Sequence, residues 1–179
     1  YAKAYTTTEM TPEEIHELGL KEVARLNAEM EKVKNQVGFK GTLLAFFEEV
    51  RNKKELKPFT EPEQVIANFE SIYERIKPNV NRLFLLQPKT KFEIRRTEAF
   101  REKTGSAEYN QGLADGSRPG IFYVPIPDVK NYNVYGDEDL FLHEAIPGHH
   151  FQISLQQENK NLPDFRKFSG FGAYVDGWA

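Results

Sequence analysis

Three stretches in the first half of the chain repeat apolar residues at helical spacing. The first follows Thr11-Pro12-Glu13-Glu14, which combines an N-cap, a proline at the first helical position and a capping-box glutamate. We expect a second helix over Thr42–Lys53, and a third that starts after Thr60 and ends before Pro78. The first helix should reach about residue 36, because one apolar stripe runs that far: Ile15, Leu18, Val23, Leu26, Met30 and Val33.

After Pro88 the pattern changes to the two-residue alternation of a half-buried strand. Lys91–Arg96 alternates in this way, and Ala107–Gln111 and Ile121–Val124 are two further strand candidates. We therefore expect a small antiparallel sheet of about three strands. The predicted fold class is α+β and mainly α: a helical domain with this sheet next to the last long helix.

Length and composition predict a single globular domain over residues 1–179. A chain of 179 residues with 39% hydrophobic and 13% aromatic residues is large enough to bury a core. Its helical part covers residues 1–88, and the sheet and last helices cover residues 89–179. Because the chain starts at Tyr1 and stops directly after Trp178-Ala179, we expect it to be a fragment of a longer protein.

Charge and residue types narrow the function. The net charge of −3, with no stripe of lysine and arginine, argues against a nucleic-acid partner. The longest apolar runs, such as Leu43–Phe47, are too short for a transmembrane segment. Without cysteine, any metal must be bound by histidine and carboxylate ligands.

The candidate chemistry lies in a helix predicted from Asp137 to Gln157, which holds three of the four histidines. His16, the fourth, is assigned no role. On a straight helix His149 would be rotated roughly a third of a turn from His143, and His150 would lie about two turns away, so neither could share an ion with it.

The Pro147-Gly148 step changes this picture. Pro147 cannot donate to the carbonyl of His143, so the helix should kink or carry a π-type bulge there. Such a distortion could bring His149, or alternatively His150, back toward His143, with Glu144 pointing at the open position of a metal.

The motif at 143–152, His-Glu-x-x-Pro-Gly-His-His-x-Gln, resembles bacterial proteins grouped as domain of unknown function 885. The resemblance runs from about Thr11 to the last residue and includes Asp115–Val124 and Asp176–Ala179. It implies a zincin-like metallopeptidase related to zinc-dependent carboxypeptidases and oligopeptidases, with one zinc ion and a peptide substrate. It also implies the remainder of a longer polypeptide, and a bacterial, exported location, periplasmic or as a lipoprotein.

The resemblance and the chemistry of the side chains suggest roles for single residues. Asp176 would be the third metal ligand, although the family usually has glutamate there, one methylene longer. Glu144 would be the general base that takes a proton from the attacking water. Arg118 is a candidate for binding a substrate carboxylate, and Tyr123 and Tyr174 are candidates for stabilising an oxyanion, with local packing as the alternative for each.

By analogy with thermolysin-like zinc peptidases, Ile121–Val124 is the candidate edge strand that holds an extended peptide. The alternative is a structural hairpin without a ligand. Two other functions stay open for the whole chain. One is a truncated or degenerate metal-binding domain without activity, and the other is a helical interaction module in which the motif is only a kinked core helix.

Overall fold

The computed structural model describes residues 1–179 as two compact units, Tyr1–Leu56 and Lys57–Ala179. The first unit is entirely helical. No helix in either unit combines the length and apolar composition that a membrane crossing requires. The first unit contains α1 (Ala2–Thr6), α2 (Pro12–Gln36), α3 (Leu43–Asn52) and the 3₁₀ turn η1 (Lys54–Leu56).

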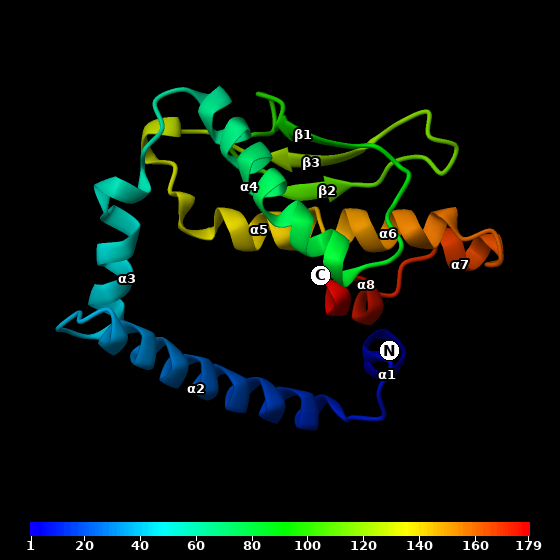
Figure 1. Cartoon of the computed structure of the whole chain (residues 1–179). Helices are drawn as coiled ribbons and strands as arrows, with labels where there is room; N and C mark the ends of the chain where they lie inside the picture. The colour runs from blue at the N-terminus through cyan, green and yellow to red at the C-terminus, as the bar shows by residue number, and fades with distance from the viewer. The chain divides into compact units, whose positions relative to one another are not determined.

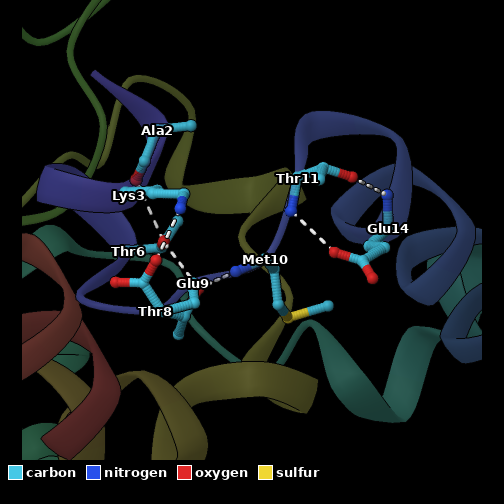
Figure 2. Close-up of polar contacts among 8 residues, drawn as sticks. All are labelled: Ala2, Lys3, Thr6, Thr8, Glu9, Met10, Thr11 and Glu14. Atoms are coloured by element: carbon cyan, nitrogen blue, oxygen red, sulfur yellow. Dashed lines mark hydrogen bonds and ion pairs between the residues drawn. The ribbon is translucent and has the colours of Figure 1, made fainter.

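The start of α2 is fixed by the capping box predicted from the sequence. The Glu14 backbone N–H donates to Thr11 Oγ1 at 3.2 Å, and the Thr11 N–H donates to the Glu14 carboxylate at 2.7 Å (Figure 2). Two of the backbone donors at this end of the helix are thereby satisfied. The predicted bounds of α2 and α3 are confirmed to within about one residue.

The second unit carries the sheet and every candidate site residue (Figure 1). This arrangement confirms the mainly helical α+β class. Its elements are α4 (Pro62–Leu83), β1 (Phe92–Arg96), β2 (Glu108–Asn110), β3 (Gly120–Val124), η2 (Val129–Asn131), η3 (Val134–Gly136), α5 (Asp137–Glu144), α6 (His149–Glu158), α7 (Asp164–Phe168) and α8 (Gly172–Trp178).

The sheet is mixed, so the expectation of an antiparallel sheet is wrong for one pair. The strand order is β1-β3-β2, with β3 parallel to β1 and antiparallel to β2. The chain reverses into β2 and reverses again into β3, which inserts between the other two strands. Ile121–Val124 is therefore central and not an edge, and the two edges of the sheet are β1 and β2.

The core lies between α4, the sheet and α5. One face of α4 is buried and its Phe69 ring meets the Phe122 ring of β3 at 5.2 Å, edge to face. The prediction that this helix ends before Pro78 is wrong, because α4 continues to Leu83. Buried residues before and after Pro78 hold the last turn of α4 against the core, although Pro78 cannot donate a backbone hydrogen bond within the helix. The buried α4 residues are Val65, Phe69, Ile72, Ile76 and Val80.

A buried carboxylate joins the chain after β1 to the chain after β3. Both oxygens of Glu102, which is 6% exposed, accept from Arg96 at 2.7 and 2.9 Å, and one also accepts from the Ile126 N–H at 2.8 Å. The Arg96 hydrogen bonds are the main cause that lowers the Glu102 pKa, since burial alone would raise it.

We expect Glu102→Gln to lower the free energy of unfolding by about 2 kcal/mol at pH 7, the range for hydrogen bonds to charged groups. A depressed folded-state pKa gives stability that is present above the unfolded-state pKa and is lost as the pH falls through the folded-state value. Urea unfolding at pH 7 and pH 3 should show the difference between the two proteins shrinking at low pH. Glu98→Gln is the control, because Glu98 is exposed and its pairing with Arg101 should contribute less than about 1 kcal/mol.

Candidate metal centre

The helix is interrupted between α5 and α6 at the predicted Pro-Gly step. The expected single helix from Asp137 to Gln157 is wrong: α5 ends at Glu144, residues 145–148 are not helical, and α6 begins at His149. The Ile146–Pro147 peptide bond is cis. Gly148 is packed so closely that an added Cβ would lie 1.8 Å from the His143 carbonyl oxygen and 2.4 Å from that of Leu142. Only glycine fits this turn.

The break brings together three of the predicted metal ligands. The rings of His143 and His149 lie 4.7 Å apart, nearly perpendicular at 78°. Asp176 of α8 joins them, and one candidate ligand atom from each of the three residues lies within 4.8 Å of the others. His149 Nε2 is 3.8 Å from Asp176 Oδ1. The two imidazoles are separated by six positions in sequence, and the interrupted helix is what makes them neighbours.

The structure directs His150 away from this group. Its ring is 2% exposed, lies 4.9 Å from the Phe92 ring of β1, and its Nδ1 is 3.0 Å from the Tyr109 hydroxyl of β2. Burial lowers the pKa of His150 to about 4, so the ring is neutral at neutral pH. Of the two alternatives for the second imidazole, His149 is the one that faces His143, and His150 anchors α6 beneath the sheet.

Two hydrogen bonds hold α8 where Asp176 can reach His149. The Gln152 amide donates to the Tyr174 carbonyl at 2.9 Å, and the Trp178 indole N–H donates to the Pro147 carbonyl at 2.7 Å. Sequence reasoning missed these positioning roles. The motif offered one signal, since its glutamine lies three residues after His149, on the same side of a helix.

Glu144 is buried beside the candidate ligands without being one of them. It is 9% exposed and ends α5, directly after His143. Burial raises the pKa of Glu144, while the charge of His143 and a hydrogen bond from the Tyr109 backbone N–H lower it in part. The net upward direction moves this carboxyl toward the pH range in which a general base is most effective. Tyr109 and Glu108, which both affect this pKa, belong to β2, so Glu144 lies near this strand.

The state of His149 fits a metal ligand. Burial, and then the charge of His143, lower the pKa of His149, which favours the neutral imidazole that binds metals. Its Nδ1 is buried without a hydrogen-bond partner, and the 3.8 Å between Nε2 and Asp176 is too long for a hydrogen bond. In a purely structural cluster, these buried polar atoms would have hydrogen-bond partners within the protein. Two imidazoles and one carboxylate are a ligand set typical of catalytic zinc sites.

The three predicted substrate-binding residues have local partners. Arg118, in the turn before β3, donates to the Gln111 carbonyl at 3.1 Å. The Tyr123 ring lies 4.7 Å from the guanidinium of Arg101. Tyr174 is exposed on α8, two residues before Asp176, and its carbonyl accepts from Gln152. These contacts do not test the substrate roles, which stay predictions for all three residues.

Comparisons with known proteins agree with this geometry at the level of family and fold. Residues 1–179 match the family described as bacterial protein of unknown function (DUF885). The structure is similar to that of a putative lipoprotein from Colwellia psychrerythraea, with a TM-score of 0.91 and 26% sequence identity over 98% of this chain. The match covers 31% of that protein, so this chain spans about a third of its length. No curated protein matches the sequence.

Proposed function

The chain belongs to the DUF885 family of bacterial proteins, and from that premise we propose that it is the metal-bearing part of a zinc-dependent peptidase. One observation carries the proposal: His143, His149 and Asp176 converge, and the buried carboxyl of Glu144 lies next to them without joining them. Three ligands with a separate carboxylate are the parts that metal-assisted hydrolysis of an amide requires.

In this proposal His143, His149 and Asp176 hold the ion. When bound, zinc would supply a Lewis acid that polarises the scissile carbonyl and makes water acidic near neutral pH. Glu144 accepts the proton of the attacking water and then delivers it to the leaving amine. Its low exposure limits competing solvent.

The strand that supports substrate binding is β2, in place of the central Ile121–Val124. Strand β2 forms an edge of the sheet, and its Tyr109 backbone contacts Glu144. An edge strand offers unpaired N–H and C=O groups to an extended peptide. We therefore propose that the peptide lies along β2, with its scissile bond close to Glu144. Substrate roles for Arg118, Tyr123 and Tyr174 stay predictions.

The scope of the proposal follows from the length of the chain relative to its structural relative. Because this chain spans about a third of that protein, we propose that the remainder of a longer polypeptide completes the cleft and sets peptide specificity. The relative is described as a putative lipoprotein, which supports an exported location as part of the same proposal.

Zinc binding tests the site directly. The purified chain, dialysed against dilute zinc and then metal-free buffer, is expected to retain about one ion, because three ligands suffice for a catalytic site. His149→Ala should weaken zinc binding by about 100-fold or more, since even residues behind the ligands cost roughly 10- to 100-fold. His16→Ala is the matched control, because His16 lies outside the ligand group, on α2.

Equal zinc affinity in His149→Ala and the unchanged chain would contradict the ligand assignment. A chain that retains no zinc at all would favour the helical interaction module, in which the motif only shapes a turn in the core. Retained zinc without peptide cleavage by the intact protein would favour the metal-binding domain without activity.

A further inference from the structure

A concave site separate from the candidate metal centre lies at the β1 edge of the sheet. It is a cavity of about 350 Å³ between α4, β1 and the turn into α6, at the lower end of the range of small-molecule pockets. Phe92, Ile146 and Phe151 give it an apolar floor. None of the three converging candidate ligands lines it, and neither does Glu144.

The polar side chains of this pocket are positively charged or neutral. Lys77 and Lys91 line it, and no aspartate or glutamate does, although the whole chain carries a net charge of −3. Lys77 Nζ is 3.5 Å from the Glu74 carboxylate and 5.3 Å from the centre of the Tyr73 ring. Lys91 makes no ion pair in the structure. The pocket therefore favours a negatively charged ligand.

The side-chain amide of Asn81 adds an uncommitted donor to the same pocket. Of the three other amide and hydroxyl side chains there, Gln87 donates to the Phe84 carbonyl, Thr90 donates to Glu158, and the Tyr73 hydroxyl makes no hydrogen bond. An anionic group near Lys91 would thus find one ammonium and one amide that the protein itself leaves unused. Both side chains are exposed and therefore free to contact a bound anion.

We propose that this pocket binds a small carboxylate with an apolar body and no free amino group. The carboxylate lies toward Lys91 and Asn81, and the body packs on Phe92 and Ile146. A free amino acid is disfavoured, because its ammonium would lie beside two lysines, and the nearby carboxylates of Glu74 and Glu158 already pair with Lys77 and Thr90. Inorganic phosphate is disfavoured because it has no apolar body to pack on Phe92 and Ile146.

The probe for this proposal is 3-phenylpropionate, compared with 3-phenylpropanamide, phenylalanine and inorganic phosphate. The full chain is used in EDTA, so that no probe can bind through a metal. Binding is followed by the NMR shift of the Ile146 methyl groups. We expect 3-phenylpropionate to bind about fivefold more tightly than the amide or phenylalanine, the upper end of the gain from one accessible charge pair. Equal affinity for acid and amide, or preferential binding of phosphate, would overturn the proposal.

Lys91→Gln and Lys89→Gln form a matched pair for the same titration. Lys91 lines the pocket and Lys89, two residues earlier, does not. Because the Lys91 side chain has no partner, its loss should leave the melting temperature unchanged while weakening 3-phenylpropionate by about fivefold. Lys89→Gln should bind like the unchanged chain. If Lys91→Gln binds 3-phenylpropionate with unaltered affinity, the proposal is wrong. If the chain does not bind zinc, this proposal is unaffected, because the titration is done without metal.

Discussion

Replacing Glu144 by glutamine is expected to lower peptide turnover by the intact protein by about 10²- to 10⁴-fold, with zinc content unchanged. Glutamine keeps the shape of the buried side chain but cannot accept a proton from water. Glu144 lies outside the group of three candidate ligands, so its loss should not release the ion. Initial rates on a mixture of short peptides, read by mass spectrometry, measure the effect on kcat/KM.

Glu138→Gln is the control on the same helix. Glu138 lies in the first turn of α5, half exposed, and pairs with Arg75 at 3.0 Å. An exposed pair of this kind contributes less than about 1 kcal/mol, so turnover should stay near that of the unchanged protein. If Glu144→Gln cleaves peptides as fast as Glu138→Gln does, Glu144 is not the general base.

Local sequence signals located α2, α3 and the start of α4, but not the pairing of the strands. The capping box at Thr11 and the apolar stripe of α4 are short-range patterns, and the structure follows them. The pattern in 91–96 and the strand candidate at 121–124 predict that strands exist, but not which strand lies in the middle. That order depends on pairings such as Arg95 with Tyr123, which are distant in sequence.

The candidate site shows the same division between local and distant information. The Pro-Gly step predicted a distortion after Glu144, but the choice between His149 and His150 depends on the backbone path through 145–148. Tyr109 was missed because its contact with His150 joins β2 to α6, 41 residues apart. No periodic pattern in the sequence predicts a contact between residues so far apart.

Gly120 shows how closely β3 and α6 approach each other at this contact. An added Cβ there would lie 2.3 Å from the Tyr109 hydroxyl and 2.6 Å from His150 Nδ1. The glycine that precedes Ile121 in the motif is thus required by packing across the sheet, and the turn residues before it gave no indication of that. Family motifs can therefore mark positions whose reason is visible only in three dimensions.

Gly148→Ala is expected to lower the free energy of unfolding of the second unit by about 3 kcal/mol, the upper part of the range for overpacked sites. The new methyl group would overlap two backbone carbonyls, those of His143 and Leu142, which no side-chain rotation can relieve. The last turn of α5 would have to move, and this carries His143 away from His149. Urea unfolding and zinc titration of the same preparation measure both effects.

Gly170→Ala is the control for the added methyl group. Gly170 precedes α8, and a Cβ added there would meet no atom within 4 Å, so the change should stay within about 0.5 kcal/mol. If Gly148→Ala is as stable as Gly170→Ala, the 145–148 turn can accept a methyl group, and the close packing at Gly148 is contradicted. If Gly148→Ala is destabilised but binds zinc with unchanged affinity, the turn does not position the metal ligands. Loss of both together would show that the close contact at Gly148 is what holds the two imidazoles side by side.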